Sequence, residues 1–300
     1  MPTTEEVSEG KYKFKITRNI QDYNGKIISH TYKIGGDYPD CVHISYTYHD
    51  NKPISAKLPH LLYEPECAIG SSLEKGSGTE LMIKYAIQYA HKDVPSIPIF
   101  EFDDDSHIES LFHLKDETAT GSEEFVIPQS DCVEKNIAKP PPRKPTKPVN
   151  LAYFYIAYHG MTWYEARFNA KMKDSERYKA YQKSLTFLID PKQKLPFTRF
   201  IEIIGGSFSS TERITELEKY YLPATTYREF FQNIPPIKRC DMLYGWINTF
   251  MEHYIRSTFS DRGWFINMLD MESKPILKGG GALSNRLKYR IFPYKKISNF

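Results

Sequence analysis

The sequence lacks the cysteine and histidine motifs that bind metals. It has four cysteines, at positions 41, 67, 132 and 240, with no Cys-x-x-Cys pair and no histidines at zinc-finger spacing. This pattern argues against a structural zinc site, and we expect the cysteines to be buried free thiols. The nine histidines include no His-Glu-x-x-His motif. We therefore expect no bound metal.

Long apolar runs and excess charge are also missing. No segment approaches the roughly 18 consecutive apolar residues of a membrane-spanning helix. The first ten residues are polar and acidic, unlike a signal peptide. The formal net charge of the 300 residues is only +3, which provides no global attraction for nucleic acid or membranes. We expect a soluble, cytoplasmic protein without membrane contact.

What the chain does contain is a glycine turn joined directly to an amphipathic helix, within residues 67–90. Gly76 and Gly78 have no Cβ to keep an anion away from the backbone, and the positive end of the helix dipole points at the turn. One face of the helix is apolar and should pack on the core. The other face should be solvated and contains Glu80, Lys84, Gln88 and His91.

Strand-like segments within 53–69 and at 97–102 flank this turn and helix, which suggests a strand, loop, helix, strand unit. A Walker A loop is excluded, because Gly76 is followed by Ser77 and Gly78 with no lysine at the required place. A dinucleotide-binding loop needs a third small residue where Leu81 stands. That interpretation stays open, since an acid at 103 or 104 would suit the ribose. An ordinary tight turn before a helix also stays open.

The segment 73–82 resembles the acyl-CoA loop of the GNAT acetyltransferase superfamily, whose motif is Arg/Gln-x-x-Gly-x-Gly/Ala. The departure is Leu73, where family members usually have Arg or Gln. The resemblance implies acetyl-CoA as cofactor. The cofactor-binding residues that it implies are Ala68, Leu73, Glu74, Lys75, Gly76, Ser77, Gly78 and Thr79.

Four segments together, the first of which includes this loop, make the resemblance tighter. Residues 73–85, 100–108, 153–168 and 226–231 with 239–240 look like the GNAT-like proteins of nucleocytoplasmic large DNA viruses. This implies an α+β fold with a GNAT-like mixed, mostly antiparallel sheet flanked by helices and a helical C-terminal extension. It also implies a viral protein, located in the cytoplasm of an infected host cell or in the virion.

The predicted domain organisation is interrupted once, where five prolines and four cations fall within 139–148. With the polar stretch before it, this suggests an insertion at about 116–150 within a GNAT-like domain of residues 11–190. After the insertion, 151–158 is predicted to be a strand. Capping boxes predict helix starts at Ser106 with Glu109 and at Thr162 with Glu165.

Residues 196–275 are predicted to form a helical region. Its expected helices are 197–204, a helix capped by Ser209 with Glu212 and ending near Tyr221, 226–231 and 240–258. The tail 278–300 mixes cations with aromatic side chains. That composition could bind single-stranded nucleic acid, but alternation of cations with Leu287, Tyr289 and Ile291 favours a terminal strand, so a nucleic-acid partner is disfavoured.

The resemblance also implies the chemistry of acetyl transfer to an amine acceptor. A base accepts the proton of the amine, and backbone N–H groups of the strand before the loop stabilise the oxyanion. Glu66, expected on that strand, is the candidate base. Tyr155 or Tyr158 is the candidate acid that protonates the departing thiolate, and strand alternation would let only one of them face the site.

Two functions remain open at this point. One is an acetyl-CoA-dependent N-acetyltransferase with an unidentified acceptor amine. The other is a non-catalytic, GNAT-derived viral protein that acts through protein partners in a virion or viral factory. A loop plugged by Leu73 or an aromatic side chain would favour the second, and an open cleft beside Gly76 and Gly78 would favour the first.

Overall fold

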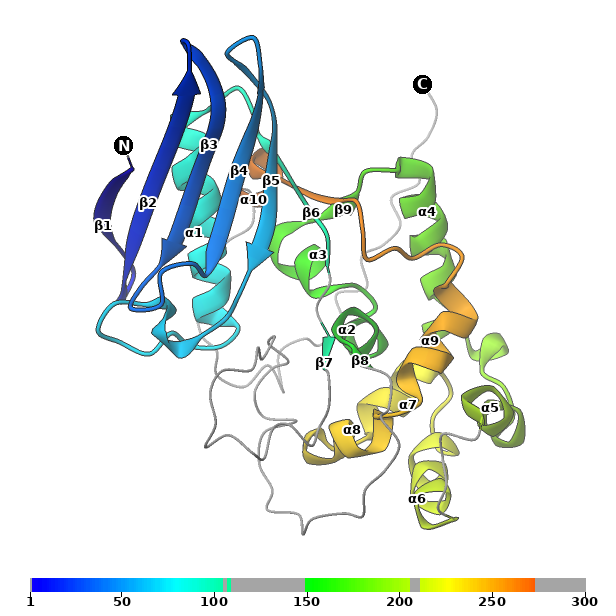
Figure 1. The fold of residues 1–300 in the computed structure, drawn as a ribbon. Helices are drawn as coiled ribbons and strands as arrows, with labels where there is room; N and C mark the ends of the chain where they lie inside the picture. Colours follow the sequence, from blue (N-terminus) through cyan, green and yellow to red (C-terminus); the bar gives the residue numbers. More distant parts are fainter. Residues whose placement is uncertain (1, 105–106, 109–148, 206–210, 273–300) are drawn as a thin grey trace.

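The computed structural model describes residues 2–104, 107–108, 149–205 and 211–272. An eight-stranded sheet, with helix α1 (Ser77–Asp93) on one face and a lobe of helices beside it, dominates the structure (Figure 1). The strand order is β1-β2-β3-β4-β5-β6-β10-β9. The strands are β1 (Thr3–Glu9), β2 (Tyr12–Tyr23), β3 (Lys26–Gly35), β4 (Val42–His49), β5 (Lys52–Leu61), β6 (Ile99–Phe102), β9 (Lys171–Met172) and β10 (Trp264–Asn267). The expected α+β, mostly antiparallel architecture is confirmed.

Buried and exposed side chains alternate along the strands of the sheet. In β2, Tyr12, Phe14 and Ile16 are buried while Lys13 and Lys15 are exposed, as expected for a strand with one solvated face. Every neighbouring pair in the sheet is antiparallel except β5 and β6, which run parallel. A parallel pair needs a crossover connection, and α1 is part of that connection.

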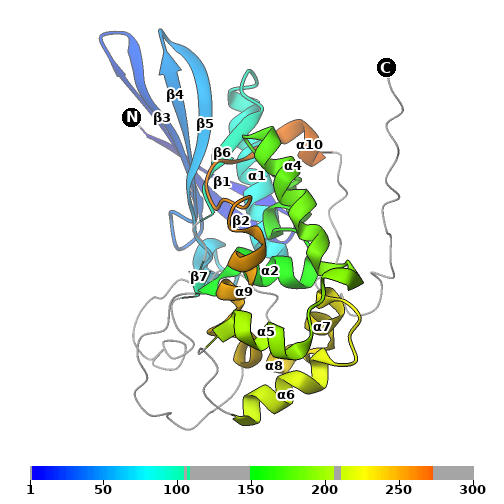
Figure 2. The same ribbon diagram turned by 90° about the vertical axis from the view of Figure 1, so that its right-hand side faces the viewer.

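Helix α1 covers one face of the sheet, with contacts to β3 and β4 (Figure 2). It buries Met82, Ile83, Ala86, Ile87 and Ala90 in this contact layer. In the two ribbon views, no described helix lies over the opposite face of β2–β5. The sheet core therefore depends on a single helix over most of its width.

Most of the other helices gather beside the sheet around an aromatic core. They are α2 (Leu151–His159), α3 (Trp163–Phe168), α4 (Ser175–Ser184), α5 (Phe197–Ile204), α6 (Thr211–Tyr221), α7 (Tyr227–Asn233), α8 (Pro236–Leu243) and α9 (Ile247–Ile255). The short helix α10 (Met268–Glu272) lies apart from them, against α1 and β10. Phe200, Tyr227, Phe230, Trp246 and Phe250 are fully buried in the aromatic core. Their rings meet mostly edge to face, as between Phe200 and Trp246 at 5.4 Å.

The predicted strand at 151–158 is wrong, because these residues form α2. The Asn150 side chain caps this helix by accepting from the N–H groups of Ala152 and Tyr153 at 2.8 and 3.3 Å. Gly160, at φ 72°, ends it. The segment is buried on nearly every side, so it lacks the helical periodicity that would have identified it.

Several other predicted elements can be compared with the structure. Helices α5 and α7 and the Thr162–Glu165 capping box are confirmed. The single helix predicted at 240–258 is wrong: α8 and α9 are separate, with Gly245 at φ 92° between them. The region predicted to be helical also contains β10, which pairs with β6 and β9 in the sheet.

Some predictions fall on residues that are not described. These include Ser106, Glu109, Ser209, the tail 278–300 and almost all of the insertion at 116–150. At the borders of the insertion, β7 (His107–Ile108) pairs with β8 (Val149–Asn150), so the chain leaves and returns at neighbouring positions.

Cys41 and Cys67 are joined in a disulfide, so the prediction of free thiols is wrong for both. Cys132 and the side chain of Cys240 lie outside the described part. The bridge ties the turn after β3 to the short 3₁₀ helix η1 (Pro65–Cys67). A hydrogen bond from the Tyr38 N–H to the Glu66 carbonyl, at 2.8 Å, joins the same two segments. A Cβ on Gly36 would stand 2.3 Å from the Ala68 backbone, so only glycine permits this contact.

We expect the double variant Cys41→Ala/Cys67→Ala to lose about 3 kcal/mol of unfolding free energy, because the bridge closes a loop of 26 residues. Urea denaturation of both proteins checks this. Reduction of the wild type should produce the same loss and leave the variant unchanged. Equal stability of oxidised wild type and variant would contradict the prediction.

A partly buried polar network joins the sheet to the end of α1. Arg18 Nε donates to His30 Nε2 at 3.4 Å and pairs with Asp93 at 2.9 Å. Tyr48 Oη lies 2.7 Å from His30 Nδ1. Burial first, then the charge of Arg18, lowers the pKa of His30, while Asp93 opposes the shift. His30 is therefore held neutral with Nε2 as acceptor.

We expect this network to make stability depend on pH. Below about pH 6.5 the unfolded chain protonates His30 while the folded chain resists. The free energy of unfolding therefore falls as pH decreases from there towards the lowered folded pKa. His30→Asn should show a smaller slope in urea unfolding between about pH 5 and 7.5. His49→Gln, at an exposed position, is the matched control and should keep the wild-type slope.

Candidate functional site

The glycine loop lies between β5 and α1, within the one parallel crossover of the described sheet. The β5–β6 ladder has only two pairs, Ala56 with Phe100 and Lys57 with Glu101. Past Lys57, β5 contains a bulge opposite Ile44, where the register with β4 shifts. The strand, loop, helix, strand unit expected from the sequence is thus present.

Gly76 and Gly78 have different roles in the loop. Gly76 immediately precedes α1 at φ 74° and ψ −81°, a conformation that favours glycine. Gly78 lies in the first turn of the helix and is buried. A Cβ at Gly78 would stand 3.0 Å from both Cγ and Cδ1 of Leu73 and 3.3 Å from Tyr12 Oη. The space next to Gly78 is therefore filled by the chain itself.

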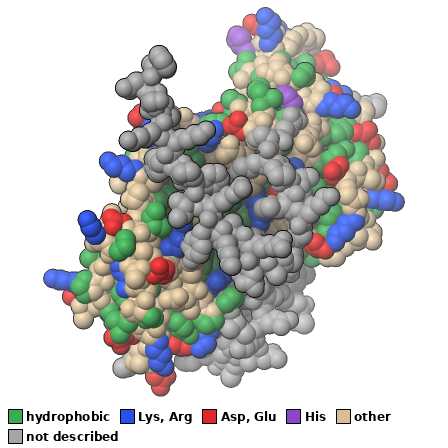
Figure 3. Space-filling view, turned by 180° about the vertical axis from the view of Figure 1, so that it is seen from behind, with side chains coloured by type: hydrophobic (Ala, Val, Ile, Leu, Met, Phe, Trp, Pro, Cys, Tyr) green, Lys and Arg blue, Asp and Glu red, His purple; other side chains and the backbone are tan. Residues whose placement is uncertain are grey.

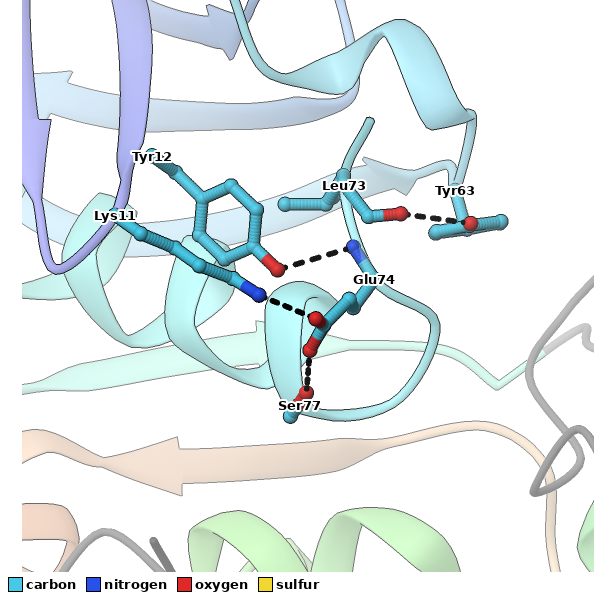
Figure 4. A network of polar contacts seen from close by, with 6 residues as sticks. All are labelled: Lys11, Tyr12, Tyr63, Leu73, Glu74 and Ser77. Carbon is cyan, nitrogen blue, oxygen red and sulfur yellow. Dashed lines mark hydrogen bonds and ion pairs between the residues drawn. The ribbon is translucent and has the colours of Figure 1, made fainter. Parts of the chain in front are cut away.

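Leu73 is only 1% exposed, and its backbone is tied on both sides. Its N–H donates to the Pro65 carbonyl at 2.8 Å, and its carbonyl accepts from Tyr63 Oη at 2.9 Å. Figure 4 shows Leu73 between Tyr12 and Tyr63, above the start of α1. The residue that departs from the family pattern is thus a fixed part of the core.

Other loop N–H groups already have acceptors within the chain. The Glu74 N–H donates to Tyr12 Oη at 3.2 Å. The N–H groups of Ser77 and Gly78 donate to the carbonyls of Lys75 and Glu74, both at 3.0 Å. A diphosphate would have to compete with these bonds.

A carboxylate also stands at the start of α1. Glu74 forms an ion pair with Lys11 and accepts from Ser77 Oγ at 3.1 Å (Figure 4). The hydrogen bond from Lys11, followed by that from Ser77, lowers the pKa of Glu74. The loop thus supplies its own anion at the positive end of the helix. Lys11, Tyr12 and Tyr63 were missed in the sequence because they come from other segments and follow no local motif.

One polar group at the site is unsatisfied among the described residues. Thr79 Oγ1 is buried without a hydrogen-bond partner, and the residue is 2% exposed. A buried hydroxyl without a partner is costly. This atom is the feature of the loop that best suits an added oxyanion.

The sequence suggested that the candidate base Glu66 lies on the strand before the loop. The structure shows that it does not. Strand β5 ends at Leu61, and Glu66 is an exposed residue of η1. Ala68, two residues further on, is buried against Gly36. The described contacts do not join Glu66 to either candidate tyrosine.

Tyr155 and Tyr158 lie on α2 and have different surroundings. The Tyr155 ring packs at a tilt against the His159 ring, with centroids 4.1 Å apart. Burial raises the pKa of Tyr155, Arg167 opposes this, and Glu80 adds to it, so the phenol is near the polar groups between α1 and α3. Tyr158 packs on Phe231 and has the Arg239 guanidinium over its ring at 4.2 Å.

The predicted solvation of the polar face of α1 is wrong for Glu80 and Lys84, whereas Gln88 is exposed and His91 is half-buried. Glu80 and Lys84 are both 6% exposed, and Arg167 of α3 reaches Glu80. The i,i+4 spacing of Glu80 and Lys84 in the sequence predicts that they pair. It does not predict that the pair is buried beside Arg167.

Comparison of the chain with protein-family models, with curated proteins and with solved structures gives no match. Within the described ranges, no helix is both long and apolar enough to cross a membrane. The same residues contain no group of three or more His, Cys, Asp or Glu side chains placed to hold a metal ion.

We expect a double-mutant cycle to detect the contact between Leu73 and Gly78. Gly78→Ala should destabilise by about 1 kcal/mol in the wild type, since overpacking of 1–3 kcal/mol outweighs the gain in helix propensity of about 1 kcal/mol. In a Leu73→Ala background the same change should stabilise. Urea unfolding of the four proteins measures the coupling, and an equal effect in both backgrounds would contradict it.

Proposed function

We propose that this chain is a GNAT-like, non-catalytic protein whose acyl-CoA loop is closed by its own side chains, so that it acts through its surfaces. The observation that carries the proposal is the packing of buried Leu73 against Gly78. The carboxylate of Glu74 at the start of α1 supports it. The role would be structural or in protein interaction, in the cytoplasm of an infected cell or in a virion.

Surface charge supports protein partners more than nucleic acid. From behind, Lys and Arg side chains are mixed with Asp and Glu over the visible described surface (Figure 3). A nucleic-acid interface usually has a concentrated basic patch.

The second candidate is an acetyl-CoA-dependent N-acetyltransferase, and the unpartnered Thr79 Oγ1 favours it. In that case the backbone of Gly76 and Gly78 and the Thr79 hydroxyl would hold the diphosphate. Bound acetyl-CoA would supply the acetyl thioester. Tyr155, rather than Tyr158, would hold the proton for a leaving thiolate, because its phenol is near Glu80 and Arg167. For Glu66 to act as the base, the acceptor amine would have to reach the exposed η1 turn.

Isothermal titration with acetyl-CoA and with CoA separates the two functions. We expect no binding heat from the wild type at about 1 mM ligand, which corresponds to a binding free energy weaker than about −4 kcal/mol. Micromolar binding that Gly78→Trp abolishes would overturn the proposal and favour the enzyme. Glu74→Gln tests the internal anion: it should not restore tight binding by itself, because Leu73 stays in place. Glu176→Gln, an exposed acid on α4, is its control.

A further inference from the structure

A buried cluster of charges lies between α1 and α3. Glu80 Oε1 is 2.7 Å from Lys84 Nζ, and Glu80 Oε2 is 3.2 Å from Arg167 Nη1. The side chains of Glu80 and Lys84 are 8% exposed and that of Arg167 is 18% exposed. Both oxygens of the one carboxylate are therefore used by two different cations.

The cluster contains more positive than negative charge. Among the described residues, neither Lys84 nor Arg167 has a second acid within ion-pair distance. One positive charge is thus left without a counter-charge in a mostly buried setting, where charges are normally paired. An ammonium has three donors and a guanidinium five, so most donors of this pair are unused by Glu80.

The surroundings of the cluster are suited to an anion. Tyr155, a neutral phenol, lies within electrostatic range of both Glu80 and Arg167. The capping box of Thr162 and Glu165 fixes the start of α3, the six-residue helix that holds Arg167 in place.

We propose that Lys84 and Arg167 bind one oxyanion group of a ligand, a phosphate or a carboxylate, at the side of α1 that faces α3. Arginine can donate two parallel hydrogen bonds to such a group, and lysine adds a point charge. The bound oxyanion neutralises the excess positive charge of the cluster. Lys84 is six residues beyond Gly78, which is about 9 Å along a helix. The site therefore does not depend on whether the glycine loop opens.

The proposal makes a prediction about stability without ligand. If Glu80, Lys84 and Arg167 only hold α1 to α3, loss of either cation should destabilise the fold. If one cation is kept for a ligand, Lys84→Met should leave a balanced Glu80–Arg167 pair and unfold at the same urea concentration as the wild type or a higher one. Glu80→Gln should destabilise strongly, since it leaves two buried cations. A marked loss in Lys84→Met would overturn the proposal.

Binding is tested with inorganic phosphate, measured by the rise in thermal midpoint and by isothermal titration on the full chain. Phosphate should raise the midpoint of the wild type, and Arg167→Gln should weaken its binding at least tenfold. Arg199→Gln removes an exposed ion pair on α5 and should bind like the wild type. Arg167→Gln changes the less buried of the two cations and tests binding separately from the stability of Lys84→Met. Equal phosphate response in all variants, or no response in the wild type, would overturn the proposal.

CoA and 3′-dephospho-CoA then distinguish the sources of the oxyanion. A tenfold preference for CoA that disappears in Arg167→Gln would identify a nucleotide 3′-phosphate as the group bound. Phosphate binding without any CoA binding would identify a separate small anion. Both results support the oxyanion site, and the second is compatible with a closed glycine loop.

Discussion

The packing of α1 on β3 and β4 determines the position of nearly every feature of interest. Because β5 and β6 are parallel, the chain must cross from one end of the sheet to the other, and α1 is the crossover. Ala86 and Ala90 are fully buried in this layer and let the helix approach closely. The approach sets the glycine loop at one end of the helix and the Arg18–Asp93 pair at the other. It also turns Glu80 and Lys84 towards α3.

The closure of the loop depends more on packing than on charge. Glu74 is more than half exposed, and exposed ion pairs contribute about 0–1 kcal/mol. A ligand with several charges could displace such a carboxylate. Leu73 is different, because exposing a buried leucine costs about 1.5–3 kcal/mol and its two backbone bonds would also have to rearrange. The side chain that departs from the family pattern is thus the main obstacle to an anion.

Sequence patterns predicted the elements whose signals are local. The glycine loop, α1 and the Thr162 cap depend on spacing within one segment, and the structure contains all three. The disulfide between Cys41 and Cys67 joins distant segments and has no spacing signal. Helix α2 lost its periodic pattern because it is buried almost all round. Strand β10 is short and becomes a strand only because β6 and β9 lie on either side of it.

The error on the polar face of α1 has a physical cause that reaches beyond this helix. A helix face with charges at i and i+4 is normally solvated, but here Arg167 from α3 also pairs with Glu80. With Lys84, the two cations exceed what one carboxylate can neutralise. Replacing a buried ion cluster by apolar side chains is often neutral or stabilising. Stability alone therefore gives no reason for three charges at this position, and an interaction with a charged ligand gives one.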